Sequence, residues 1–505
     1  MTFLELLVAA LTILGAYVAY LFKIKWAARK QLSWVRPVPG LPFVGNLLDF
    51  GGPTKILQDI TRMLNNEEKL VYIEVGFTWG LVASNYEFME FILSSNEILD
   101  KSSDYEAIKP WLSTGLLIST GQKWRKRRKI ITPAFHFSIL EQFVDVFDLN
   151  ATILVKNLKK LPPNETFDVY PYMTALTLDA ICETAMGVNT NSQSGQNEDY
   201  VNAVKGFSTI ANARMFSLFH DNFTFKFTKN YWKMRDYLKV IHGFSNKVIE
   251  ARKRELQNQP NPASLEQNNK TEVEGKKKKL ALLDVLLNTT IDGQPLSQED
   301  IREEVDTFMF AGHDTTSSSM ASTLYLLSKH PDIQTLVRNE QKNIFGEDRD
   351  RPTTYRDLQE MKYLENVLKE SLRLYPPVAT VARTVTHDIE YKGHCIPKDT
   401  TISLFIYGIN RDKDIYENPD EFQPDRFLDT NTLSRFPYAF IPFSAGPRNC
   451  MGQKYAMLEM KSVISKVVRN FELITSNQEL ILSSELILKS TNGVPIKLRP
   501  YDWQK

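Results

Sequence analysis

The sequence predicts a mainly helical α+β fold that follows a single N-terminal membrane helix. Three observations support this fold class: an apolar run at residues 3–22, several long segments with helical periodicity, and short β-rich segments. Hydrophobic residues make up 43% of the 505 residues and charged residues 24%, which is ordinary for a folded protein with a large core. The net charge of +1 gives no reason to expect nucleic acid as a partner.

The N-terminal run has the length and composition of a membrane anchor. Residues 3–22 are apolar apart from Glu5 and Thr12, and about 20 helical residues span the ~30 Å hydrocarbon core of a bilayer. The basic residues that follow are Lys23, Lys25, Arg29 and Lys30. Because positive flanks stay in the cytosol, we expect residues 1–22 to anchor a cytosolic domain. A cleaved signal peptide is the alternative, but it would begin with basic residues and end in small ones.

A basic and proline-rich linker separates the anchor from the rest of the chain. Residues 23–45 contain Pro37, Pro39 and Pro42, which keep the chain extended and prevent the anchor helix from continuing into the domain. The linker acts as a stiff spacer, as a hinge that sets how the domain sits on the bilayer, or as both. Residues 46–505 then form one domain, with helices expected near residues 139–160, 172–186, 230–256, 297–328, 331–345 and 358–374.

Short strands complete the α+β pattern. They are expected near residues 71–75, 80–84, 384–391 and 401–405, and as C-terminal hairpin strands at 480–482, 486–489 and 494–498 around a turn at residues 491–493. Residues 257–279 are too polar to order themselves and are expected to form an exposed loop. The lysine run that ends this loop is either solvated or in contact with a membrane surface. The sequence has no phosphate-binding P-loop and no dinucleotide fingerprint, so nicotinamide is not expected to bind this chain directly.

Three cysteines, Cys182, Cys395 and Cys450, lie far apart and form no CxxC pair. This pattern argues against a disulfide framework and a structural zinc site, and it favours a reducing compartment. Around Cys450, the segment from Phe443 to Gly452 contains two glycines and a proline, which predicts a tight loop with a positive-φ turn at Gly446. A helix from Gln453 would bring its N-terminus to the sulfur and favour a thiolate, although a buried, inert cysteine is the alternative.

This loop resembles the haem-binding loop of cytochromes P450 at Phe443, Gly446, Arg448, Cys450 and Gly452. The resemblance implies the P450 fold, with these residues binding haem b and Cys450 as the axial metal ligand of its iron. Arg448 could also pair with an anion near the sulfur.

The rest of the P450 pattern extends over nearly the whole chain. Glu370 and Arg373 resemble the family's ExxR pair and Arg426 its third member, and together they would brace the core behind the haem loop. Trp124 and Arg128 resemble the WxxxR helix and would face the haem propionates. The remaining cations of that helix, which are Arg125, Lys126, Arg127 and Lys129, would form an outer surface that docks the acidic flavin domain of a reductase or is merely solvated.

Residues 311–316 break the rules of a helix interior with glycine, aspartate and consecutive threonines, and such violations are expected at functional sites. The resemblance implies that this segment lies over the haem, where Gly312 would make room for dioxygen and Asp314 and Thr315 would deliver protons. His313 as an imidazole ligand is discounted, because it is single and Cys450 already fits as ligand.

The helix around residues 304–316 resembles the signature of family-4 P450s, and the whole chain looks like an insect microsomal member. Ala311 replaces the glutamate that forms an ester with the haem in many family members, so the haem is expected to be noncovalent. The resemblance implies a monooxygenase of the endoplasmic reticulum membrane that acts on a small apolar substrate (fatty acid, hydrocarbon, hormone or xenobiotic). Its partners would be NADPH-cytochrome P450 reductase, cytochrome b5 and membrane lipid. The alternatives are a haem-thiolate isomerase or dehydratase and a non-catalytic haem or lipid carrier.

Overall fold

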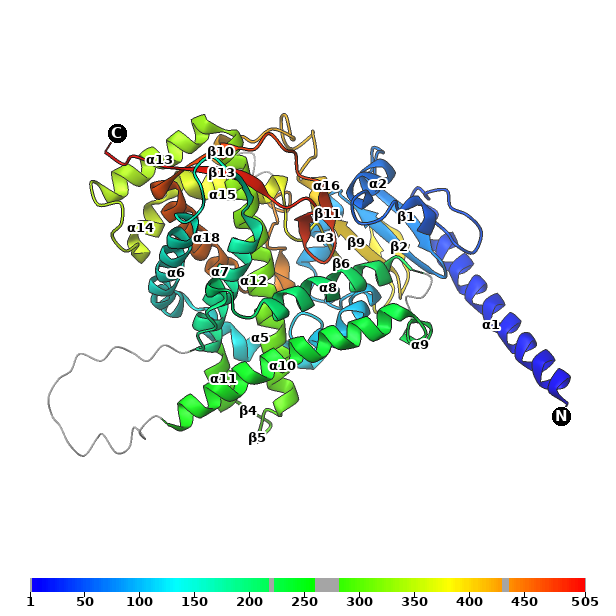
Figure 1. The fold of residues 1–505 in the computed structure, drawn as a ribbon. Coiled ribbons are helices and arrows are strands. Elements are labelled where there is room, and N and C mark those ends of the chain that lie inside the picture. The colour runs from blue at the N-terminus through cyan, green and yellow to red at the C-terminus, as the bar shows by residue number, and fades with distance from the viewer. Residues whose placement is uncertain (1, 218–221, 259–280, 429–435, 505) are drawn as a thin grey trace.

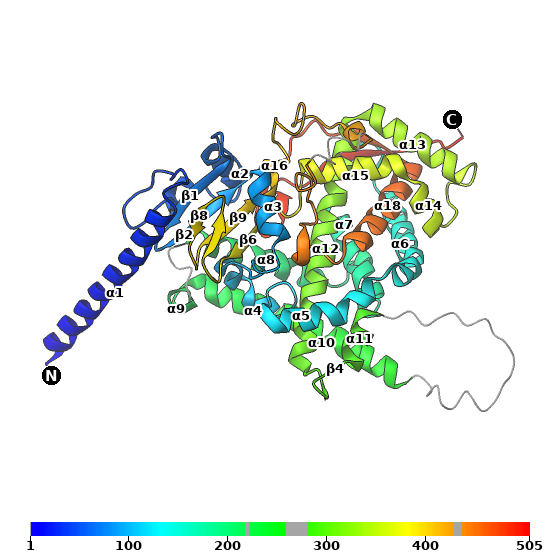
Figure 2. The ribbon, with the colours of Figure 1, turned by 180° about the vertical axis from the view of Figure 1, so that it is seen from behind.

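The computed structural model of the chain describes residues 2–217, 222–258, 281–428 and 436–504. A helix-rich part surrounds the long helix α12, and a smaller part rich in strands lies between it and the projecting helix α1 (Figure 1). The two termini lie on opposite sides of the molecule in both views (Figures 1 and 2). The predicted exposed loop at 257–279 lies outside the described residues except for its first two.

The α-helices account for about half of the described residues. They are α1 Phe3–Gln31, α2 Ile56–Met63, α3 Tyr86–Ser94, α4 Lys109–Leu112, α5 Gly121–Ile131, α6 Phe137–Leu158, α7 Tyr170–Ile181, α8 Glu198–Met215, α9 Asn222–Phe225, α10 Lys229–Gln257, α11 Leu282–Asn288, α12 Gln298–Lys329, α13 Pro331–Phe345, α14 Tyr355–Glu360, α15 Lys362–Leu374, α16 Ile406–Ile409 and α18 Gln453–Asn470. Short 3-10 helices are η1 Leu47–Asp49, η2 Ser103–Ala107, η3 Thr132–Phe135, η5 Ser192–Ser194, η7 Pro424–Phe427 and η8 Gly446–Arg448, and η4 Cys182–Met186 is a π-helical turn.

The strands form one mixed sheet and several small ones. They are β1 Leu70–Val75, β2 Thr78–Ala83, β3 Thr166–Asp168, β4 Thr290–Ile291, β5 Gln294–Pro295, β6 Thr380–Thr384, β7 Ile389–Tyr391, β8 His394–Ile396, β9 Thr401–Phe405, β10 Phe471–Thr475, β11 Leu482–Ser484, β12 Leu488–Ser490 and β13 Pro495–Pro500. The largest sheet has the order β1-β2-β9-β6, in which β2 and β9 are parallel and the other pairs antiparallel. A second sheet has the order β10-β13-β3.

The predicted fold class is confirmed, and α12 is its centre. A capping box of Ser297 and Asp300 starts the helix, and nearly every residue from Ile301 to Ser328 is buried. A helix buried on all sides shows only a weak amphipathic pattern. The many serine and threonine hydroxyls of α12 bond to carbonyls one turn earlier, as Thr323 does to Ser319 at 2.8 Å, which satisfies them inside the core.

The helix predicted at residues 358–374 is instead two helices. The break falls at Met361, whose ψ of 73° is not helical. The carboxylate of Glu340, on α13, accepts hydrogen bonds from the N–H groups of Tyr363 and Leu364 at 2.6 and 3.0 Å. This contact caps α15 from a neighbouring helix, which periodicity within one segment cannot reveal.

The C-terminal hairpin was also predicted with the wrong partners. Strand β11 pairs with β12, so the hairpin closes around residues 485–487. The turn at 491–493 leads from β12 to β13, which pairs with β10 and β3 instead. The apolar alternation correctly predicted strands in this region, but it does not identify the partner of each strand.

Helix α1 continues past residue 22 to Gln31 and joins the domain directly. Lys25 is 6% exposed, and its ammonium lies 2.7 Å from Glu74 and donates to the Gly76 carbonyl at 3.0 Å. Phe22 stacks edge-on against Phe77 at 5.5 Å. The second half of α1 is therefore packed on the β1–β2 hairpin, while its first half projects from the molecule (Figure 1).

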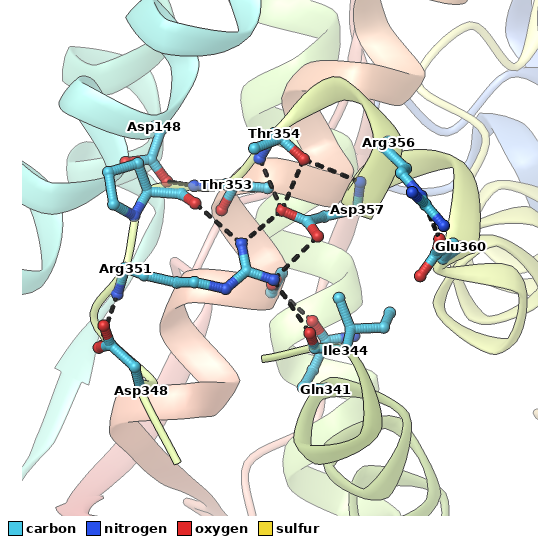
Figure 3. Close-up of polar contacts among 12 residues, drawn as sticks. Asp148, Gln341, Ile344, Asp348, Arg351, Thr353, Thr354, Arg356, Asp357 and Glu360 are labelled. Atoms are coloured by element: carbon cyan, nitrogen blue, oxygen red, sulfur yellow. Dashed lines mark hydrogen bonds and ion pairs between the residues drawn. The ribbon is translucent and has the colours of Figure 1, made fainter. Parts of the chain in front are cut away.

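The connection from α13 to α14 illustrates how the helical part is fastened (Figure 3). Arg351 donates to both carboxylate oxygens of Asp357, at 2.7 and 2.9 Å, and Thr354 caps the helix by accepting from the Asp357 N–H. In the same view, Arg356 and Glu360 form an ion pair on the outer side of α14 (Figure 3).

Candidate active site

A cavity of about 800 Å³ lies between the middle of α12 and the cysteine loop. Its walls include Cys450 on one side and Ala311, Gly312 and Thr315 of α12. Most of the remaining wall is apolar, and it comes from the loop before α5, the largest sheet and the turn between β11 and β12. An internal, largely apolar cavity with a few placed polar groups is the usual form of a small-molecule site.

The cysteine loop is built on close backbone contacts. Gly446 has φ 67°, and a Cβ there would lie 1.8 Å from the Leu93 carbonyl oxygen, so only glycine fits. The Cys450 N–H donates to the Phe443 carbonyl at 2.9 Å, and Phe443 also lines the cavity. At Gly452 the constraint is weaker, because φ is −82° and a Cβ would lie an ordinary 3.8 Å from the Cys450 Sγ.

The exposed surface of Cys450 belongs to the cavity wall. Burial raises the pKa of its thiol, and this effect outweighs the Gly452 N–H and the Arg128 guanidinium, which both lower it. The N–H group at the start of α18 thus favours the thiolate, as expected, but less than burial opposes it, whereas a coordinated cation deprotonates a thiol outright. No cluster of three or more His, Cys, Asp or Glu that could hold a metal occurs among the described residues. A single sulfur facing a cavity fits a metal that brings its other ligands with it, as haem iron does.

Cations gather beside the sulfur. Arg128 donates to the Asn449 carbonyl at 2.9 Å, and Arg448 donates to the carbonyls of Ser119 and Leu117 at 2.8 and 2.9 Å. The Arg448 guanidinium also lies 4.8 Å from the centre of the buried Trp124 ring. All three of the side chains predicted here, Trp124, Arg128 and Arg448, line the cavity.

Two further cations of this group, Lys101 and Arg383, were not predicted. Burial lowers the pKa of both, and the nearby Arg383 and Arg448 lower that of Lys101 further. Within the described ranges, none of Lys101, Arg128, Arg383 and Arg448 has a carboxylate within ion-pair distance. An anionic cofactor with two carboxylates, such as haem, would neutralise this group, so the residues present fit haem. Arg383 stands in an otherwise uncharged strand, Thr380–Thr384, and that was the available sequence signal.

On the α12 side, Thr315 lines the cavity and its hydroxyl donates to the Ala311 carbonyl at 2.7 Å. A Cβ on Gly312 would lie 2.7 Å from the Ile181 side chain, so a larger residue here would force Ile181 of α7 to shift. His313 is buried outside the cavity wall, and its Nδ1 lies 3.0 Å from the Met309 carbonyl.

Asp314 does not line the cavity. Its carboxylate lies 2.8 Å from the ammonium of Lys489 and accepts a hydrogen bond from the Tyr170 hydroxyl at 3.3 Å. Burial raises the pKa of Asp314, but Lys489, His313 and Tyr170 together outweigh burial and lower it. Asp314 is therefore ionised, and Lys489, a lysine within the apolar pattern of β12, is a partner that sequence reasoning missed.

Glu370, Arg373 and Arg426 meet in the core, as the sequence pattern suggested. Glu370 and Arg373 have no exposed surface and are joined at 2.7 and 2.8 Å, and Arg426 donates to Glu370 at 2.9 Å. The other Arg373 nitrogen donates to the carbonyls of Asn410 and Pro419. We call this group of three side chains the brace.

The outer surface of α5 differs from its prediction at one position. Arg127 is 3% exposed and faces inward, where its guanidinium contacts carboxylates of α12, including Glu304 at 3.7 Å. The helix places residues 124, 127, 128 and 131 on one side, so Arg127 falls on the buried stripe. Arg125, Lys126 and Lys129 are exposed, and Lys126 pairs with Asp292 at 2.8 Å.

Comparison with known proteins gives the family. A family model for cytochrome P450 matches residues 35–498. Cytochrome P450 4d2 of Drosophila melanogaster is 42% identical over 94% of this chain and 95% of its own. Cytochrome P450 4V2 of Homo sapiens is 42% identical over 97% of this chain and 95% of its own. Cytochrome P450 4c3 of Drosophila melanogaster is 40% identical over 97% of this chain and 94% of its own. The resemblance to family 4 is confirmed, and the chain belongs to the cytochrome P450 family of haem-containing monooxygenases.

Proposed function

We propose that this chain is a membrane-bound monooxygenase that inserts one oxygen atom of dioxygen into lipid-like substrates, with electrons from NADPH through a reductase. The observation that carries the proposal is the cavity itself, which has the Cys450 sulfur on one wall and the Thr315 hydroxyl on another. Haem, when bound at Cys450, supplies one-electron redox chemistry and dioxygen activation. The largely apolar lining favours a fatty acid, hydrocarbon, hormone or apolar xenobiotic as substrate.

The residues around the cavity would divide the remaining tasks. Trp124, Arg128 and Arg448 would hold the haem propionates, together with the additional cations Lys101 and Arg383. Ala311 carries no carboxylate, so we propose that the haem is held without an ester bond. The brace would keep the cysteine loop rigid from behind.

Proton delivery would use Thr315 at the cavity wall and Asp314 behind it. The Asp314 carboxylate is ionised and paired with Lys489 at 2.8 Å, so it would need to leave this partner and take up a proton before it passes that proton to water or Thr315. Lys489 would then be a third residue of the proton-delivery group, in addition to Asp314 and Thr315, which the sequence suggested.

The remaining surfaces supply the proposed partners. Helix α1 is long and apolar enough to cross a membrane, and we propose that it anchors the chain in the endoplasmic reticulum with the domain in the cytosol. The exposed cations Arg125, Lys126 and Lys129 of α5 would dock the acidic flavin domain of NADPH-cytochrome P450 reductase, and cytochrome b5 would compete for the same face.

The test is turnover with labelled dioxygen. Purified protein with reductase and NADPH is expected to place one ¹⁸O atom from ¹⁸O₂ in a fatty-acid or alkane product, and to be inactive without NADPH. Turnover of an oxygenated lipid without reductase, NADPH or dioxygen would instead identify an isomerase or dehydratase. Haem binding without turnover of any compound in a broad lipid panel would favour a carrier.

A further inference from the structure

Two adjacent buried carboxylates of α12 hold part of the cavity wall in place. The loop at residues 113–120 connects α4 to α5 and begins with Ser113 at φ 48°. The Thr114 N–H and hydroxyl both donate to Glu303, at 3.1 and 2.9 Å. The Leu116 N–H donates to Glu304 at 3.0 Å. Each carboxylate therefore holds one residue of the loop.

The loop lies directly on the surface of α12. A Cβ at Gly115 would lie 2.4 Å from the Thr307 hydroxyl and 2.5 Å from the Glu303 carbonyl oxygen, so only glycine fits between the two held residues. The far end of the loop is held from the opposite side, because Arg448 donates to the carbonyls of Leu117 and Ser119. The loop is thus fixed between α12 and the cysteine loop.

Cations from α5 neutralise the carboxylates. Lys123 pairs with Glu303 and also donates to the Thr114 hydroxyl at 2.6 Å. Arg127 lies 3.8 Å from Glu303 and 3.7 Å from Glu304. Glu303, Glu304 and Arg127 are 2%, 0% and 3% exposed, so the network is inside the protein.

Burying these carboxylates costs more free energy than a purely structural contact would require. Burial raises the pKa of Glu304 to about 7, although the Leu116 N–H and Arg127 oppose the change. Apolar side chains could fasten a loop to a helix without burying two like charges side by side. What the carboxylates add is fixed direction, because each accepts a hydrogen bond from one particular backbone N–H.

We infer that Glu303 and Glu304 are specificity-determining positioning residues, which fix Leu116 and Leu117 as part of the cavity wall. Both leucines line the cavity, as do Thr307 and Phe308 on the helix that holds them. The position of this wall would decide which carbon of an extended apolar substrate reaches the reacting centre. This inference rests on the proposed monooxygenase function, and it adds the residues that select the site of attack.

Amide hydrogen exchange of the haem-loaded full chain tests the contact without turnover. Glu304→Leu removes the acceptor of the Leu116 N–H, and exchange in residues 113–118 is expected to rise about tenfold. Glu304→Gln keeps an acceptor oxygen and is expected to restore protection to within about twofold of the wild type. Glu299→Leu is the matched control on the same helix, because Glu299 is exposed and pairs only with Arg302 among the ion pairs of the described residues.

Product analysis tests the consequence. With dodecanoic acid as probe, Glu304→Leu is expected to spread hydroxylation over more carbons than the wild type and Glu304→Gln do. If Glu304→Leu fails to fold, Thr114→Val replaces it, because it removes the hydroxyl contacts with Glu303 and Lys123 and keeps the backbone N–H bond to Glu303. Unchanged exchange in the folded variant, or faster exchange with unchanged product positions, would overturn the inference. A wild type that produces no hydroxylated product would overturn the proposed function, while exchange would still report on the loop.

Discussion

Removing the charge of Glu370 tests the brace most severely. In Glu370→Gln one carboxylate oxygen becomes an amide nitrogen, which cannot accept a hydrogen bond. One oxygen of Glu370 accepts from Arg373, Arg426 and the Gln423 N–H, and the other accepts from Arg373 alone. Whichever oxygen is replaced, the amide N–H₂ group faces the Arg373 guanidinium, and a buried cation loses its counter-charge.

The expected loss of stability follows from burial. Removing one partner of a fully buried ion pair costs about 3–5 kcal/mol, because the remaining charge is left uncompensated. Glu370 and Arg373 are both 0% exposed, so the full range applies. We expect the free energy of unfolding of Glu370→Gln to fall by about this amount, measured by urea unfolding with the haem absorbance and circular dichroism as probes.

A matched surface pair provides the control. Arg356 and Glu360 are joined at 2.9 Å on the outer side of α14, with side chains 88% and 48% exposed (Figure 3). Glu360→Gln is expected to change the free energy of unfolding by less than about 1 kcal/mol. If Glu370→Gln destabilised the protein no more than Glu360→Gln, the reasoning about the brace would be refuted.

Three further predictions follow from the site. Lys489→Met should raise the pKa of Asp314 and lower the free energy of unfolding by about 3–5 kcal/mol at neutral pH. Because the Asp314 pKa is lowered in the folded state, the difference from the wild type should shrink as pH falls below the ordinary carboxyl value of about 3.9 and through the lowered folded pKa. A difference that does not depend on pH would argue against the pair. Acid extraction should release all haem from the wild type, and haem that stays on the protein by mass spectrometry would contradict a noncovalent site beside Ala311. Replacing Arg125, Lys126 and Lys129 together by alanine should raise the reductase concentration for half-maximal turnover by about tenfold at low salt. Arg127→Ala, the control, should lower thermal stability and leave this concentration unchanged. If Arg127→Ala raised it as much as the triple replacement does, the buried position of Arg127 would be contradicted.

The sequence was most informative where a local constraint belongs to one segment. Gly446 was expected to adopt a positive φ, and it has φ 67° in the tight turn of the cysteine loop. Long helices such as α12 and α13 were located within about two residues, because their periodicity is a property of the segment itself. The partners of β13, the break at Met361 and the inward direction of Arg127 depend on contacts with distant parts of the chain.

The same distinction applies to the candidate site. The residues of the cysteine loop and the brace follow from motifs, whereas Lys101, Arg383 and Lys489 come from separate strands and loops that meet only in the folded protein. Asp314 shows most clearly what the motif does not predict. Its neighbour Thr315 lines the cavity, whereas the Asp314 side chain points to Lys489. Spacing along a helix indicates which residues are close in sequence, but the direction of each side chain depends on what packs around the helix.

The carbon-monoxide difference spectrum of the reduced protein tests the central claim most directly. Cys450→Ala is measured alongside the wild type, with Cys182→Ala and Cys395→Ala as controls for the loss of a thiol elsewhere. A Soret band at the red-shifted position of thiolate-ligated haem, lost only in Cys450→Ala, is the predicted result. A band at the position typical of histidine-ligated haem, or the same thiolate band in Cys450→Ala, would contradict the assignment of Cys450 as ligand.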